Sequence, residues 1–174
     1  MSSDTPLQQA IENYQQGNTE SAIEELQRIL LSEPHNPLVH IEFANILMRE
    51  KRFDDARSLL QSLSVDDKKK PTVLALMGQL ESIDMVISAP TYEDLLEIIG
   101  QTPTNCLARE QLSAHYKLRG DYSAAMEQLL EIVRNDRSYN DDAGRLELLK
   151  TFELLGMQHE LVAIYRRKLA EILN

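Results

Sequence analysis

Apolar residues recur along this chain at intervals of three and four positions, which is the period of a helix with one buried face. Leu26 and Ile29 keep this spacing near the start of the chain, and Leu60 and Leu63 keep it again later. No stretch of the sequence alternates between apolar and polar residues in the way that predicts a strand. The pattern therefore predicts an all-α fold of about ten helices in five antiparallel pairs.

Small residues recur at a fixed interval of 34 positions. Ala10, Ala44 and Gly78 stand at one position of a first helix, and Ala22 and Ala56 stand at one position of a second helix. A bulky side chain at these places would keep the two helices of a pair apart. An interval of 34 residues is typical of the tetratricopeptide repeat (TPR), so the sequence resembles that family and its α-α superhelix.

A further copy of the repeat follows in the second half of the chain. It consists of Leu112, Tyr116, Gly120, Tyr122, Ala125, Leu129 and Ile132, in the order and spacing of a TPR. Gly17 and Gly120 hold the same turn between the two helices of a repeat. The third pair is expected to be irregular, because Pro90 stands where its second helix needs a small residue.

The last two helices, at about residues 141–155 and 158–173, also depart from the repeat pattern, as the end of a solenoid is expected to do. We therefore expect one TPR-like domain over residues 1–174. Its parts are residues 1–35, 36–70, an irregular repeat at 71–104, a regular repeat at 105–139 and a degenerate helix pair at 140–174.

The chain is acidic, with 28 Asp and Glu residues against 18 Lys and Arg residues and a net charge of −10. This charge repels phosphate backbones and anionic membrane surfaces, so we expect neither nucleic acid nor a membrane as a partner. No apolar run is long enough to span a bilayer, and the first residues lack the features of a signal peptide. These features favour a cytoplasmic location.

Candidate chemistry is sparse. Cys106 is the only cysteine, so one copy of the chain cannot form an internal disulfide or a thiolate metal cluster. The four histidines are scattered and lack the spacing of a helical zinc site. Nucleophile elbow, P-loop and dinucleotide-binding motifs do not occur. We assign no catalytic, cofactor-binding or metal-binding residue, and we expect a binding module rather than an enzyme.

The first helix of each TPR lines the concave surface, so its inward positions select the ligand. In the first two repeats these positions are Leu7, Ile11, Tyr14, Ile41, Asn45 and Met48. This mostly apolar set disfavours capture of an acidic C-terminal tail, which requires basic and polar side chains. It could accept an apolar segment or a partner helix, or it could simply pack against neighbouring helices.

The C-terminal helix carries a basic stretch followed by an apolar stripe. The residues concerned are Tyr165, Arg166, Arg167, Lys168, Leu169, Ile172 and Leu173. One interpretation is that the cations complement the helix dipole while the leucines cap the core. The other is a docking helix that binds a hydrophobic groove of a partner, with Tyr165, Arg166, Leu169, Ile172 and Leu173 as its contacts.

Residues 129–174 resemble the C-terminal end of bacterial thioredoxin-like co-chaperones, the chaperedoxin family, in which a thioredoxin domain precedes TPR helices. The features that carry this resemblance are Asn135, Asp136, Arg137, Asn140, Asp141, Ala143, Arg145, Phe152, Gly156 and the stretch YRRKL at residues 165–169. The resemblance implies a cytoplasmic stress-response chaperone. Such a protein holds unfolded or oxidatively stressed clients and passes them to the chaperonin GroEL or the DnaK system.

The thioredoxin domain of that family is not part of this sequence, and Cys106 matches no thioredoxin motif, so no redox activity is carried over. The start at Ser2, just ahead of the first helix, is what an excised C-terminal part or a short relative would show. Three functions remain open. They are a protein-binding module of a co-chaperone, a scaffold for self-assembly or complex assembly, and a substrate-positioning domain of a thioredoxin-type oxidoreductase.

Overall fold

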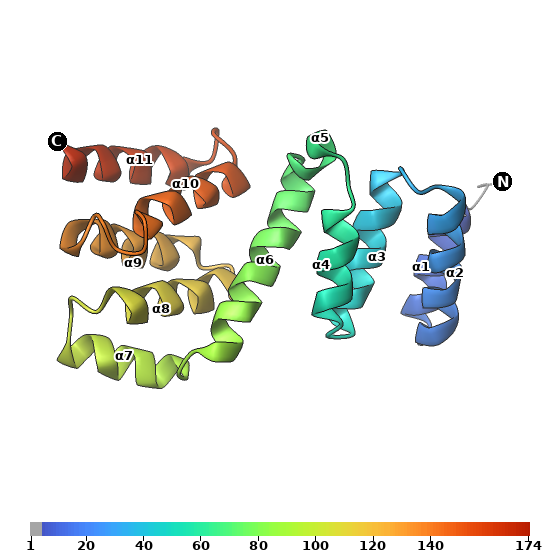
Figure 1. The fold of residues 1–174 in the computed structure, drawn as a ribbon, viewed down its shortest axis with the longest axis horizontal. Coiled ribbons are helices and arrows are strands. Elements are labelled where there is room, and N and C mark those ends of the chain that lie inside the picture. Colours follow the sequence, from blue (N-terminus) through green and yellow to red (C-terminus); the bar gives the residue numbers. More distant parts are fainter. Residues whose placement is uncertain (1–4) are drawn as a thin grey trace. The chain divides into compact units, whose positions relative to one another are not determined.

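The computed structural model describes residues 5–174, and these residues form helices joined by turns, with no strand among them (Figure 1). The helices are α1 (Pro6–Gln15), α2 (Thr19–Ser32), α3 (Pro37–Arg49), α4 (Phe53–Gln61), α5 (Val65–Lys68), α6 (Pro71–Ser88), α7 (Tyr92–Gln101), α8 (Cys106–Leu118), α9 (Tyr122–Asn135), α10 (Ala143–Leu155) and α11 (Glu160–Leu173). The predicted all-α fold is confirmed. The short helix α5 was not predicted, and the expected start of the first repeat at residues 1–4 lies outside the described residues.

Several helices begin where a polar side chain can bond to a free backbone N–H group. The Thr5 hydroxyl accepts from the N–H of Gln8 at 3.3 Å, and Pro6 follows as the first helical residue. Asn105 caps α8 in the same way, by accepting from the N–H of Ala108 at 3.0 Å. Because these caps satisfy donors that a helix leaves unpaired, the boundaries are set locally by the sequence.

The contacts of the chain group into two compact units, and the division falls between Met77 and Gly78. In unit 1, α1 packs on α2, α2 on α3, and α3 on α4. The four small residues of these two pairs, Ala10, Ala22, Ala44 and Ala56, are each 0% exposed. Their burial supports the close helix approach that the sequence predicts. The expected division into five repeats stays a prediction.

The expectation for Gly78 was wrong. A Cβ atom built at this glycine would meet nothing within 4 Å, so no paired helix approaches closely there. Helices α6 and α7 instead meet at a bend of 74°. No single helix among residues 5–174 is long and apolar enough to cross a membrane, and only α6 and α7 taken together reach that length and composition.

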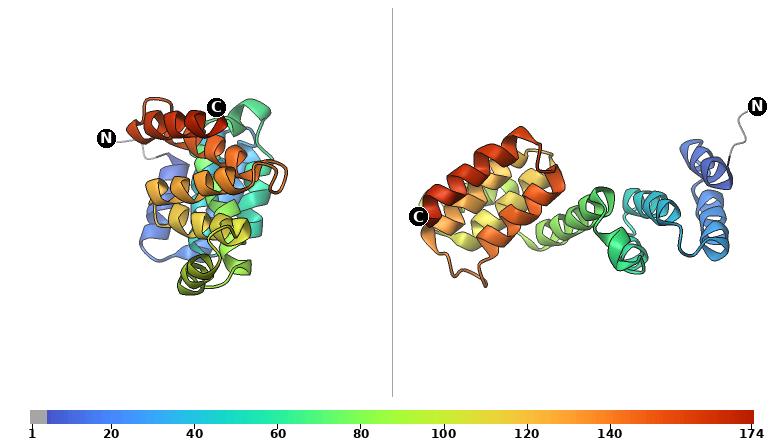
Figure 2. Two further views of the ribbon diagram at one scale, coloured as in Figure 1. Left: turned by 90° about the vertical axis from the view of Figure 1, so that its left-hand side faces the viewer. Right: turned by 90° about the horizontal axis from the view of Figure 1, so that it is seen from above.

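Unit 2 is built around α9, which contacts α8, α10 and α11. Figures 1 and 2 show α11 lying alongside α9. A Cβ atom at Gly144 on α10 would lie 2.9 Å from Cγ2 of Ile132 on α9. Helix α10 can therefore pack this closely on α9 only because residue 144 has no side chain. The core around α9 consists of Met126, Leu129, Leu130, Ile132, Val133, Leu148, Phe152, Val162, Tyr165 and Leu169.

The turns between paired helices require a left-handed backbone. Gly17 and Gly120 adopt φ values of 90° and 75°, as expected for the turn position that they share. Lys51 lies 34 residues after Gly17 and adopts a φ of 60° at the equivalent place. A side chain with a Cβ atom is disfavoured in this conformation, so the second repeat stores local strain that the first repeat avoids.

We expect Lys51→Gly to raise the free energy of unfolding by about 0.5 to 1 kcal/mol, because glycine adopts the left-handed conformation without a steric cost. The Gly120→Ala variant should lower it by about 1 kcal/mol for the same reason. Urea unfolding followed by circular dichroism measures both values. If Lys51→Gly lowered the free energy of unfolding instead, the contacts of the lysine side chain would stabilise the fold by more than the left-handed backbone destabilises it.

Candidate functional site

A groove of about 300 Å³ lies between α1 and α3 in unit 1. Its lining comprises Thr5, Leu7, Gln8, Ile11, Glu12 and Gln15 from the first helix and its cap, with Leu38 and Glu42 from α3. Leu7 and Ile11 are one helical turn apart, so both project from the same face of α1. The two helices thus form the walls of an open recess in which apolar and polar side chains alternate.

The groove combines exposed apolar surface with negative charge. Leu38 is 53% exposed, although a large apolar side chain gains free energy by leaving water. Both charged residues in the lining are glutamates, Glu12 and Glu42. Such a groove can bury an apolar side chain of a partner and attract a cation beside it, whereas it repels a carboxylate.

The structure places the predicted groove residues in different environments. Leu7 and Ile11 line the groove. The Tyr14 hydroxyl instead donates to Oε1 of Glu50 at 2.7 Å, and this bond raises the pKa of Tyr14. Ile41, Asn45 and Met48 are half-buried on α3 and are not among the groove-lining residues. The protein-binding role of the whole set stays a prediction.

Leu38 and Glu42 are not among the residues that the repeat pattern predicts for the groove. The 34-residue interval carries the positions of α1 onto α3 unchanged, which holds only if the same face of every first helix lines the groove. A groove between two neighbouring helices is lined by the sides of the helices that face each other. Helix α3 therefore contributes Leu38 and Glu42, which lie three residues before the predicted Ile41 and Asn45. The signal available in the sequence was the apolar residue directly after Pro37, at the start of a helix.

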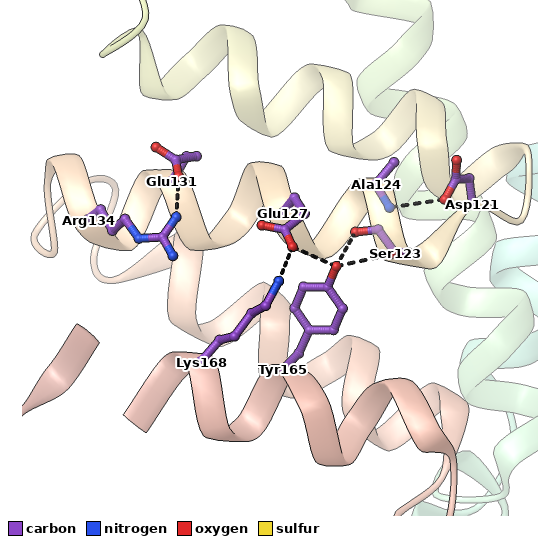
Figure 3. Close-up of polar contacts among 8 residues, drawn as sticks. All are labelled: Asp121, Ser123, Ala124, Glu127, Glu131, Arg134, Tyr165 and Lys168. Carbon is purple, nitrogen blue, oxygen red and sulfur yellow. Dashed lines mark hydrogen bonds and ion pairs between the residues drawn. The ribbon is translucent and has the colours of Figure 1, made fainter. Parts of the chain in front are cut away.

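The second predicted surface, the C-terminal helix, is joined to α9 by a partly buried hydrogen-bond network (Figure 3). Tyr165 is 3% exposed, and its hydroxyl donates to Oε1 of Glu127 at 2.9 Å. The Ser123 hydroxyl lies 3.0 Å from the same tyrosine oxygen. Lys168 also donates to Glu127, and its ammonium group lies 4.7 Å from the centre of the Tyr165 ring.

The charge of Glu127 is stabilised by this network. Burial on its own would raise the pKa of this carboxyl group, but the hydrogen bonds from Lys168 and Tyr165, together with the charges of Lys168 and Arg134, outweigh burial and hold the pKa below its ordinary value of 4.5. The same bond to Glu127 raises the pKa of Lys168. Both groups are therefore charged near neutral pH, and together they fasten α11 to α9.

This network determines which part of α11 a partner can touch. Tyr165 and Leu169 belong to the core of unit 2, and Ile172 packs against that core. Arg166 is exposed and Leu173 is 39% exposed. The core-capping interpretation fits Tyr165 and Leu169, and only the outer side of the helix presents side chains for docking.

Two family models match the chain, and both describe a tetratricopeptide repeat. One matches residues 13–80, and the other matches residues 87–174, which is half of the sequence. The chain belongs to the tetratricopeptide-repeat family. TPR domains are in general non-catalytic modules that bind proteins, so the function is protein–protein interaction or scaffolding. Residues 5–174 of this TPR chain hold no group of three or more side chains that could bind a metal ion.

Solved structures similar to this TPR chain include a domain of protein VP0806, of unknown function, from Vibrio parahaemolyticus RIMD 2210633. The identity is 24%, the match covers 97% of this chain and 98% of that one, and the TM-score is 0.43. The structure of MamA matches with 18% identity over 94% of each chain and a TM-score of 0.44. No curated protein matches the chain significantly.

We expect Tyr165→Phe to lower the free energy of unfolding by about 1 kcal/mol at neutral pH, because a partly buried hydrogen bond to a charged carboxylate is lost. The pKa of Glu127 is lowered in the folded protein, so its contribution is present above pH 4.5 and is lost as the pH falls through the lowered value. The difference in the free energy of unfolding between wild type and Tyr165→Phe should therefore become smaller at acidic pH. Urea unfolding at several pH values measures it, with Arg166→Ala as an exposed control that costs less than about 0.5 kcal/mol. A pH-independent difference would contradict the assigned role of Glu127.

Proposed function

We propose that this TPR chain is the protein-binding module of a thioredoxin-like co-chaperone, which holds unfolded client proteins and works in the cytoplasm. The observation that carries the proposal is the groove between α1 and α3, with its exposed Leu38 and its acidic rim. The resemblance of residues 129–174 to thioredoxin-like co-chaperones supports the choice of partners, which are unfolded clients and a receiving chaperone.

The groove suits a client that is recognised by general chemistry rather than by one sequence. An unfolded chain exposes apolar side chains that a native protein buries. Leu7, Ile11 and Leu38 can shield such a side chain from water, while Gln8 and Gln15 can bond to the polar backbone next to it. The small contact area makes binding weak and reversible, as a holdase requires when it passes a client on.

The outer side of α11 is the proposed contact for the chaperone that receives the client, which the resemblance implies to be the chaperonin GroEL or the DnaK system. Arg166 and Leu173 supply exposed charge and exposed apolar surface there. Because Tyr165 and Leu169 are core residues, deleting the helix would disturb unit 2. Substitutions at the two exposed positions are therefore the suitable probes of this contact.

The groove is tested by the ability of the chain to suppress aggregation of a denatured protein on dilution, measured by light scattering. We expect wild type to suppress it and Leu38→Glu to require about tenfold more protein for the same effect, because a central apolar contact is replaced by a third carboxylate. Leu31→Glu is the matched control. Leu31 is 82% exposed on α2, lies outside the groove lining and undergoes the same change of charge.

Two results would contradict the proposal. One is a wild-type chain that leaves aggregation unchanged. The other is equal activity of the Leu38→Glu and Leu31→Glu variants, which would place the client elsewhere on the molecule.

A further inference from the structure

Unit 2 contains a small cleft of about 50 Å³ between α6, α8, α9 and α10. Glutamates from three helices line it, namely Glu81 on α6, Glu110 on α8 and Glu147 on α10. On α8, Ser113 lies three residues after Glu110, and Lys117 lies four residues after Ser113. These three side chains therefore share one helix face. The chain thereby brings distant polar residues together around one recess.

A buried hydroxyl group in this cleft lacks a partner. Ser113 lines the cleft and is 1% exposed, and its Oγ atom has no hydrogen-bond partner within the part of the chain that the structure describes. A buried polar atom without a partner is unfavourable and is rare in folded proteins. Because the hydroxyl group rotates about its own bond, it can turn to accept from a donor that enters the cleft.

The carboxylates around the cleft are only partly engaged by donors of the chain itself. Glu147 accepts from Lys117 at 2.8 Å and from Lys150 at 2.9 Å. Burial would raise the pKa of Glu147, but the charges and hydrogen bonds of Lys117 and Lys150 together outweigh burial and keep the pKa below its ordinary value. Glu110 accepts from the Tyr139 hydroxyl at 2.8 Å. A carboxylate has about four acceptor positions, so each glutamate keeps capacity for a further donor.

The balance of charge favours a cation in this cleft. Three carboxylates, those of Glu81, Glu110 and Glu147, face two ammonium groups, those of Lys117 and Lys150, which leaves one negative charge without a counterion among these five side chains. Apart from Ser82, the remaining wall is apolar and consists of Met85, Ala114 and Leu129. Acceptors beside an apolar wall are what a charged group on an apolar stem requires.

We propose that this cleft binds the ammonium group of a lysine side chain from a partner protein. The lysine ammonium is compact and carries three donors, which match the Ser113 hydroxyl and the carboxylates of Glu110 and Glu81. A volume of about 50 Å³ suits this small group better than the broad planar guanidinium of arginine. The site lies in unit 2, apart from the α1–α3 groove, and does not rest on the proposed function.

The site can be tested on the full chain by ¹⁵N NMR titration with Nα-acetyl-lysine N-methylamide. We expect saturable shifts at the amides of Glu110, Ser113 and Lys117, with an affinity on the order of millimolar. Nε-acetylation of the probe removes its charge and should abolish these shifts. Ser113→Ala and Glu81→Gln should each weaken binding about tenfold, whereas Glu97→Gln on the exposed part of α7 should leave it unchanged.

The dispersion of the NMR spectrum shows whether each variant is folded. Glu81 is exposed, so Glu81→Gln keeps the test valid if Ser113→Ala disturbs the core. No saturable shift at about 50 mM probe, far above the expected affinity, would overturn the proposal. Equal binding of the Nε-acetylated probe would overturn it as well. The first result would indicate that an ordered water, or the carbonyl one turn earlier on α8, satisfies the Ser113 hydroxyl, and the second would show that the cleft does not recognise the charge.

Discussion

The close approach of paired helices at alanine is the constraint on which unit 1 depends. Ala10, Ala22, Ala44 and Ala56 are fully buried at the two pairs, and no longer side chain could occupy these places without separating the helices. Because the helices are close, the leucines beside the alanines leave water and form the core. In unit 2 the same requirement falls on Gly144, where α10 meets α9.

In unit 1, the close packing of α1 on α2 and of α3 on α4 leaves other faces of α1 and α3 free for binding. Leu7, Ile11 and Leu38 form the apolar part of the groove lining, beside two glutamates, Glu12 and Glu42. Unit 2 presents a different chemistry, because its cleft is small, acidic and lined by a hydroxyl group without a partner. One kind of scaffold thus offers a wide recess of mixed apolar and polar lining in one unit and a small recess with clustered charged groups in the other, as expected for a TPR module that binds proteins.

The helical period, the capping residues and the 34-residue interval predict most of the fold, because each acts within one helix pair. The sequence could not predict features that depend on how pairs meet. Lys51 takes a glycine conformation without a glycine, and Gly78 has the expected small side chain without a close partner helix. Leu38 and Glu42 were missed for the same reason, since a groove is a property of two helices. The burial of Tyr165 depends on Glu127 and Ser123, about 40 residues away in the sequence, which no local pattern reveals.

The most direct test of this account compares Ala44→Leu with Gly78→Ala by urea unfolding. Ala44→Leu should lower the free energy of unfolding by about 1 to 3 kcal/mol, because the added side chain forces α3 and its neighbours apart. Gly78→Ala should raise it by about 0.5 to 1 kcal/mol, because alanine favours the helix and the new methyl group meets nothing within 4 Å. If Ala44→Leu were tolerated, or if Gly78→Ala were equally destabilising, close approach at the alanines would not be what holds the helix pairs together.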